Sequence, residues 1–163
     1  MFSGSLKAYL SSVVLACVLT GAAALAQKPQ HLPIRAQFQH NGQRILLEVA
    51  WTPEQQTLGL MYRERLEPNR GMLFPFYPPR PVQFWMKNMR APIDMVFLYE
   101  NKVIAIYPNV PPCRRNPCPT YGPDGLVDAV IELAPGRAQE LGLKVGDTLI
   151  VRLIQPSGVP KRE

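Results

Sequence analysis

The chain has 163 residues, a formal net charge of +6 and 18 prolines. This length favours one domain, and the prolines, all beyond residue 28, exclude a helical bundle, a coiled coil or a long solenoid, because proline breaks helix interiors and central β-ladders. The sequence contains no P-loop, no G-x-G-x-x-G and no H-E-x-x-H motif, and Ser157 is the only serine beyond residue 12, so any enzymatic chemistry would rest on carboxylates, lysine or arginine.

The first 26 residues have the pattern of a secretory signal. Lys7 precedes an apolar stretch, and Ala24-Leu25-Ala26 is a small-x-small cleavage site, which predicts an exported protein beginning at Gln27, in the periplasm or outside the cell, with only transient membrane contact. Two alternatives stay open: an uncleaved anchor, because the apolar run approaches the roughly 20 residues that span a bilayer, and a lipoprotein modified at Cys17.

The region from 27 to 62 predicts a linker, a β-hairpin and a helix. Residues 27–33 are expected to form the linker. Two strands, 34–40 and 43–50, flank Asn41-Gly42, a strong hairpin signal. Thr52 is then expected to cap a helix running to about Tyr62, with Pro53 in its first turn and Gln55 completing a capping box.

A second predicted hairpin carries the most informative residues. After a short strand at 71–76, strands 82–88 and 93–99 are expected to pair around the loop 89–92, because both have apolar residues on each face. This register puts Lys87 opposite Asp94 and Phe84 opposite Phe97. The hairpin therefore predicts an ion pair beside Trp85, although an ordinary cross-strand pair without function explains the two charges equally well.

The C-terminal half predicts further strands and a cysteine loop. Cys113 and Cys118 lie in the turn-rich segment 111–125, and in an oxidising compartment they predict one disulfide, worth about 2 kcal/mol. A reactive thiol pair or a zinc site is less favoured, because the spacing is not C-x-x-C and the histidines lie far away in sequence. The remaining expected elements are strands at 102–110, 127–134 and 148–154, a short helix at 136–141, and a flexible tail at 155–163.

Together these elements predict a mainly β (α+β) domain over residues 34–154. We expect a compact small barrel or sandwich of seven to eight short strands with one or two short helices. Five methionines between Met61 and Met95 could bind Cu(I), but Met72, Met86 and Met95 fall in apolar strand patterns, and methionine is mostly a core residue. We therefore expect neither a metal nor a cofactor, and no nucleic-acid partner, because the basic residues are scattered.

Several short motifs resemble a known family. They are Gly59–Arg63, Gly71–Phe74, Phe84–Met89, Pro92–Phe97, Val130–Leu133, Gly136 and Gly146-Asp147. In this order they resemble the bacterial and archaeal family catalogued as domain of unknown function 192, or uncharacterised protein family 0127, over residues 34–154. The resemblance implies a compact, mostly β domain that is often exported, and it implies no activity. The chain departs from the pattern at Met89, where a small polar residue is commoner, and in the insertion at 111–119.

Three function hypotheses follow. The first is a binding module of the cell envelope for a sugar or organic anion, because an aromatic ring stacks on a ligand while charged and amide groups orient it. The second is an acid–base enzyme using Asp94 and Glu132, and the third is a structural or chaperone-like accessory with an exposed apolar patch. The candidate ligand-binding residues are Arg63, Trp85, Lys87, Asn88, Asp94 and Glu132.

Overall fold

The computed structural model describes residues 27–154. The predicted signal peptide with its two alternatives, and the predicted tail at 155–163, fall outside the described residues. Within them the chain forms nine strands and two short helices, so the predicted mainly β class is confirmed. Of the two architectures left open, the structure is sandwich-like rather than a closed barrel.

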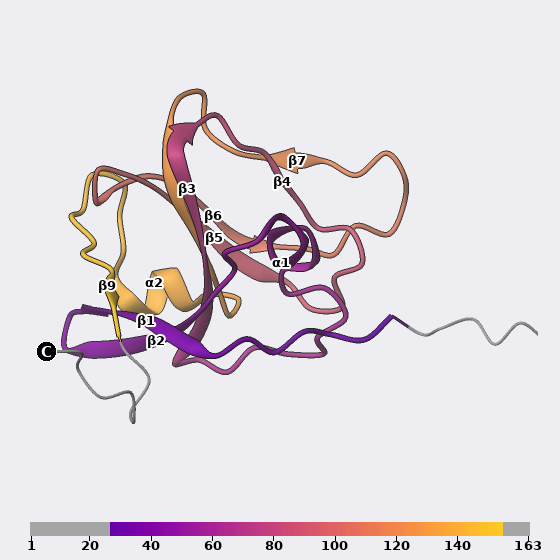
Figure 1. The fold of residues 1–163 in the computed structure, drawn as a ribbon, viewed down its shortest axis with the longest axis horizontal. Coiled ribbons are helices and arrows are strands. Elements are labelled where there is room, and N and C mark those ends of the chain that lie inside the picture. Colours follow the sequence, from indigo (N-terminus) through magenta and orange to yellow (C-terminus); the bar gives the residue numbers. More distant parts are fainter. Residues whose placement is uncertain (1–26, 155–163) are drawn as a thin grey trace, which may run out of the picture.

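Seven strands form one sheet in the order β6-β5-β8-β3-β2-β1-β9, and β4 and β7 form a separate two-stranded sheet (Figure 1). β2 and β3 run parallel, and the other neighbours in the large sheet run antiparallel. The elements are β1 (Ile34–His40), β2 (Gln43–Val49), α1 (Pro53–Leu58), β3 (Arg70–Arg80), β4 (Phe84–Trp85), β5 (Ile93–Tyr99), β6 (Lys102–Val110), β7 (Thr120–Tyr121), β8 (Val127–Leu133), α2 (Arg137–Leu141) and β9 (Arg152–Leu153).

The local signals near the N-terminus are confirmed. Asn41 and Gly42 both have positive φ, 46° and 77°, as the tight turn between β1 and β2 requires. Thr52 caps α1 through a complete capping box with Gln55. The helix ends at Leu58 rather than at Tyr62, because the next residue, Gly59, takes φ 46° and leaves the helical region.

The large sheet has an apolar core on each face. One core contains Phe38, Ile45, Leu47, Val96, Leu133 and Leu141, and α2 covers it. The other contains Met72, Phe74, Met86, Met95, Phe97 and Val130, on the side of the sheet where α1, β4 and β7 lie (Figure 1). Residues 93–98 of β5 are all buried because both faces of that strand are covered, as its sequence predicts.

The predicted hairpin of 82–88 with 93–99 is wrong. The neighbours of β5 are β6 and β8, and β4 has only two residues, which pair with β7. β8 is apolar along most of its length and offers β5 a long ladder between two cores, which the segment around Lys87 cannot match. The expected contact of Phe84 with Phe97 nevertheless exists, as an edge-to-face packing with centroids 5.8 Å apart.

The last predicted strand is shorter than expected because residues 144–154 serve two partners. Asp147 and Leu149 bond first with the start of β6, around Asn101 and Val103. The segment then leaves β6, and only β9 reaches β1. The segment 144–154 therefore contacts both the start of β6 and β1, but the sheet does not close into a barrel.

Neither α1 nor α2, the helices of the described region, has the length and apolar character needed to cross a bilayer.

Candidate functional site

Asp94 lies on the face of the sheet that α2 covers. Its carboxylate is fully buried and accepts three backbone N–H groups, those of Asn109, Gly136 and Ala138, at 2.7 to 2.9 Å. Two of these donors belong to the first turn of α2, where N–H groups have no partner within the helix. Asp94 therefore holds the start of α2 and the end of β6 together, and the predicted ion pair with Lys87 does not form.

Lys87 lies instead against Trp85. Its Nζ is 5.2 Å from the centroid of the indole, a cation–π contact. Trp85 is 46% exposed and Met86, which follows β4, is buried, so the chain turns the tryptophan outwards and the methionine into the core. The two predicted residues thus form a pair at the surface, on the side of the sheet opposite to Asp94.

An open groove of about 430 Å³ adjoins Trp85. We call it the Trp85 groove. The guanidinium of Arg80 lies 5.0 Å from the centroid of the Phe76 ring, so a second cation stacks on a second aromatic ring at this groove. Side chains of three elements line it: Pro53, Gln56 and Thr57 of α1, Phe76 and Arg80 of β3, and Pro81, Val82, Gln83, Phe84 and Trp85 leading into and through β4.

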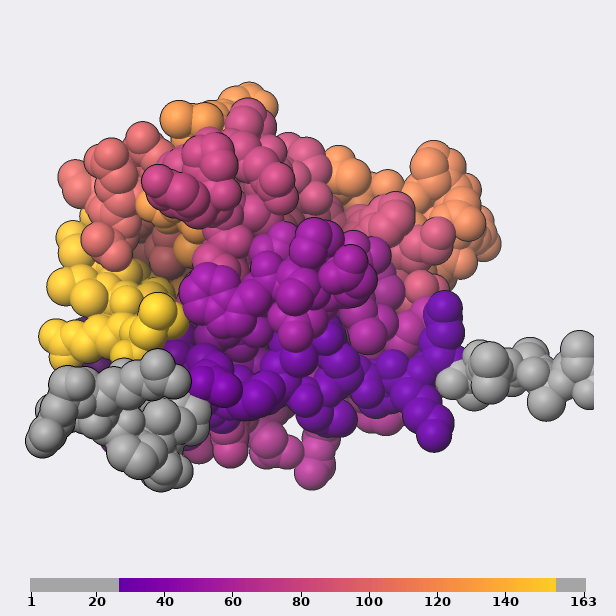
Figure 2. Space-filling model, in the orientation of Figure 1, coloured from indigo at the N-terminus to yellow at the C-terminus, as the bar shows by residue number. Residues whose placement is uncertain are grey.

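Arg63 belongs to a different place, beside the N-terminal segment. Its guanidinium forms a bidentate, buried ion pair with Glu48 at 2.8 and 2.6 Å and also donates to the carbonyl of Gln30. Glu48 Oε2 accepts the N–H of Leu32. The side chain of Gln30 donates to two carbonyls at the end of α1, and in the space-filling view the N-terminal segment lies along this region (Figure 2). Arg63 therefore fixes residues 30–32 against the domain.

Glu132 is the most unusual ionisable group of the described residues. It is 5% exposed, on the central strand β8, and its Oε2 is buried without a hydrogen-bond partner. Burial raises the pKa of its carboxyl to about 8, while the charge of Arg63 acts in the opposite direction. Since Glu132 pairs with Met95 and Asp94 pairs with Leu133, the two carboxyl groups point to opposite faces of the sheet. They do not converge on one cavity, as an acid–base pair would require.

Asn88 completes the six predicted site residues. It has a φ of 60°, and its side chain donates to the sulfur of Met61 at 3.6 Å, while its carbonyl accepts from Tyr62. Asn88 thus joins the two loops 59–66 and 86–92. The structure brings together Trp85 with Lys87 and places Arg63 near Glu132, but it does not gather all six residues into one site.

Sequence reasoning missed Glu48, Gln30, Phe76 and Arg80. Glu48 occupies a polar position near the end of a strand, and nothing local marks it as the partner of Arg63. Phe76 is the last residue of the strand predicted at 71–76 and Arg80 lies beyond it, whereas the structure extends β3 to Arg80. Cys113 and Cys118 form the predicted disulfide, with their Cα atoms 5.6 Å apart.

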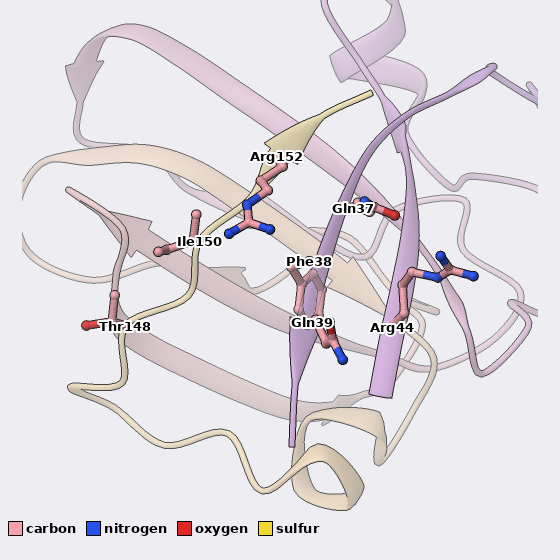
Figure 3. A pocket seen from close by; sticks show the side chains of 7 residues that line it. All are labelled: Gln37, Phe38, Gln39, Arg44, Thr148, Ile150 and Arg152. Carbon is pink, nitrogen blue, oxygen red and sulfur yellow. The ribbon is translucent and has the colours of Figure 1, made fainter. Parts of the chain in front are cut away.

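Two further grooves lie on the side of β1 and β9. One, of about 330 Å³, is polar and opens between β1 and the segment leading to β9; Arg44 and Arg152 enter it from β2 and β9 (Figure 3). The other, of about 580 Å³, is more apolar and is lined in part by Trp51, which is 55% exposed, and Leu153. None of the six predicted residues lines either groove.

Within residues 27–154, no three His, Cys, Asp or Glu side chains are grouped closely enough to hold a metal ion.

Comparison with known proteins places these features in a family. The model of the family DUF192, described as uncharacterized, matches residues 36–151. A protein from Sinorhizobium meliloti, named as a proposed transcription regulator, is 33% identical, with a TM-score of 0.64 over 72% of this chain and 92% of its own. A protein of unknown function from Novosphingobium aromaticivorans is 31% identical, with a TM-score of 0.63 over 80% of this chain and 98% of its own. No curated protein matches. The chain therefore belongs to the DUF192 family.

Proposed function

We propose that the protein is an exported binding module for a sugar or small organic anion, held in the Trp85 groove. The observation that carries this proposal is the half-exposed indole of Trp85 on the wall of an open groove. An exposed aromatic face stacks on the apolar side of a sugar ring or on a planar anion. A volume of about 430 Å³ lies within the range of small-molecule sites.

Charge supports an anionic ligand. Arg80 lines the groove and stacks on Phe76, Lys87 stacks on the ring of the lining residue Trp85, and the lining contains no carboxylate. A sugar that carries a carboxylate combines the two requirements, since its ring can stack on Trp85 and its charge can pair with either cation. The amide side chains of Gln56 and Gln83 supply further hydrogen-bonding groups, although Gln56 Nε2 already donates to the carbonyls of Ala50 and Pro75.

Tryptophan fluorescence tests the proposal directly. A Trp51→Phe variant leaves Trp85 as the only tryptophan, so a titration with glucuronate or galacturonate oligomers should change its emission, and neutral glucose oligomers should change it less. A ligand present at 100 times its Kd should also stabilise the fold by about 2.7 kcal/mol in thermal unfolding.

Matched variants separate binding from support of the fold. Trp85→Ala and Arg80→Gln should each weaken binding by about tenfold or more, whereas Trp51→Ala, which alters another groove, should leave binding unchanged. Saturable binding of duplex DNA, or sugar binding that survives Trp85→Ala, would overturn the proposal.

The exported part of the proposal rests on residues 1–26. Mass spectrometry of protein recovered from the producing cells should give a chain that begins at Gln27. Recovery of the full-length chain, or of a chain with lipid on Cys17, contradicts cleavage at this position.

One observation supports the alternative hypothesis of a structural or chaperone-like accessory. Trp51 and Leu153 are both more than half exposed beside the apolar groove of about 580 Å³, as a surface that binds unfolded segments would require. If the protein acts in this way, it should suppress light scattering by a reduced, aggregating client protein, and Trp51→Ser should abolish that effect. Suppression that persists in Trp51→Ser contradicts a role for this groove.

A further inference from the structure

Two methionines flank Glu132 in the large sheet. In the register of the sheet, Met72 of β3 and Met95 of β5 lie directly on either side of Glu132. Residues paired in this way have Cβ atoms about 4.5 to 5.5 Å apart and project from the same face. Both methionines are fully buried, and Met86 belongs to the same apolar cluster.

Nothing among the described residues satisfies this carboxyl group. Glu132 Oε2 is buried and has no hydrogen-bond partner, which is costly for a polar atom in an apolar cluster. The guanidinium of Arg63 acts on Glu132 only through its charge, because its hydrogen bonds go to Glu48 and to the carbonyl of Gln30. A buried oxygen without a partner thus belongs to a residue that lies between two methionines in the ladder.

We propose that Glu132, Met72 and Met95, with Met86 of the same apolar cluster, form a binding site for a soft monovalent cation such as Cu(I). Thioether sulfur is a soft, neutral donor and selects Cu(I). The cation displaces the proton of the buried carboxyl group, and the resulting carboxylate supplies the single negative charge that makes the site neutral when a monovalent ion is bound. A divalent ion would leave a net charge buried in an apolar cluster, which is unfavourable.

This site is independent of the Trp85 groove. The groove is lined by α1, the end of β3 and β4, and its lining includes none of the proposed donors Glu132, Met72, Met95 and Met86. It is also distinct from the sites that histidine, cysteine and carboxylate groups form, none of which occurs within residues 27–154. The sequence places these methionines in apolar strands, and only the register of the sheet brings two of them to Glu132.

Silver(I) is a redox-inert probe of such a site. The full chain, with its disulfide intact and labelled with ¹³C at the methionine methyl groups, is titrated with Ag(I) in chloride-free buffer. The methyl signals of Met72, Met95 and Met86 should shift together and stop changing after one equivalent. Circular dichroism spectra recorded during the titration show whether the ion has unfolded the chain.

Conservative variants give the controls. Glu132→Gln and Met95→Leu keep the shape of the core and should weaken Ag(I) binding by about tenfold or more. Met61→Leu is the matched control, because the sulfur of Met61 already accepts from Asn88 and does not neighbour Glu132 in the ladder; its affinity should be unchanged. Three results would each contradict the proposed site. They are shifts confined to other methionines, a titration that does not saturate at one equivalent, and an unchanged Ag(I) affinity in Glu132→Gln. If a variant fails to fold, the titration of the unmodified chain still tests whether Met72, Met95 and Met86 bind Ag(I) together.

Discussion

The carboxylate of Asp94 takes the place of a helix cap at the start of α2. Replacing Asp94 by Ala leaves the N–H groups of Asn109, Gly136 and Ala138 without an acceptor in a buried setting. Each such loss costs about 1 to 3 kcal/mol, so we expect the free energy of unfolding to fall by about 3 to 5 kcal/mol in urea titrations near neutral pH.

Lys87 supplies the control for that measurement. It contacts Trp85 at the surface, so Lys87→Ala should cost about 1 kcal/mol or less. The double variant should lose the sum of the two single losses to within about 0.5 kcal/mol, because the residues share no partner. A larger coupling energy would show that the two charges do interact.

The buried carboxyl of Glu132 predicts a dependence of stability on pH. Its pKa is raised from 4.5 to about 8, so between these values the folded state holds a proton that the unfolded state has lost. The contribution to stability is complete below about pH 4.5 and is lost as the pH rises towards 8, with a slope that approaches about 1.4 kcal/mol per pH unit. Glu132→Gln stays neutral, and so its stability relative to the native chain should increase with pH.

Urea unfolding of both chains at several pH values from about 5 to about 8 measures this difference. The other titrating groups are common to the two proteins, so their contributions cancel in the difference between the two free energies of unfolding. Parallel stability curves would show that Glu132 is ionised in the folded state at neutral pH, with a cation or solvent near its oxygen.

At the level of elements, Gly71 allows β3 to pack closely between β2 and β8. A Cβ at this position would lie 2.7 Å from the carbonyl oxygen of Glu132 and 2.8 Å from a methyl carbon of Leu47. The backbone of a central strand cannot yield easily, so Gly71→Ala should destabilise the fold by about 1 to 3 kcal/mol in urea unfolding. Gly42→Asn, in an open turn that favours this residue, should change stability by less than about 1 kcal/mol.

The disulfide fastens the cysteine loop that contains β7. Alkylation without reductant should label neither Cys113 nor Cys118 in the folded protein. Replacing both cysteines by serine should lower the free energy of unfolding by about 2 kcal/mol, the loop-closure entropy of so short a segment. Labelling of both thiols in protein recovered from the producing cells would favour a reactive pair.

The sequence predicted the elements that have a local signal and missed those that depend on distant partners. The turn at Asn41-Gly42, the cap at Thr52 and the buried run of β5 are each encoded within a few residues. The pairing of β4 with β7 joins segments 35 residues apart through two residues each, too few for a periodic pattern.

The same distinction applies to the candidate site. Trp85, Lys87 and Glu132 are recognisable from short motifs, but their neighbours are not. Glu48 becomes the partner of Arg63, and Met72 and Met95 become the neighbours of Glu132, only through the order β5-β8-β3-β2 in the sheet. Strand order depends on the packing of whole faces, which no window of the sequence contains.

At the scale of the whole molecule, the large sheet separates two kinds of buried carboxylate. Asp94, on the side of α2, is fully hydrogen-bonded and stabilises the fold. Glu132, on the side of α1, β4 and β7, is left with a free oxygen. The Trp85 groove and the Glu132 cluster both lie on this second side. The face covered by α2 therefore provides rigidity, and both candidate sites belong to the other face.

The segment from 144 to 154, which touches both edges of the large sheet, also bears on the behaviour of the protein in crowded solution. An uncovered strand edge presents free N–H and C=O groups and templates β-pairing with a neighbouring molecule. Asp147 and Leu149 bond to the start of β6, and β9 offers only two residues at the opposite edge. Because the start of β6 is occupied and β9 is only two residues long, these parts of the sheet edges present little backbone for intermolecular strand addition, which disfavours amyloid-like self-association through them.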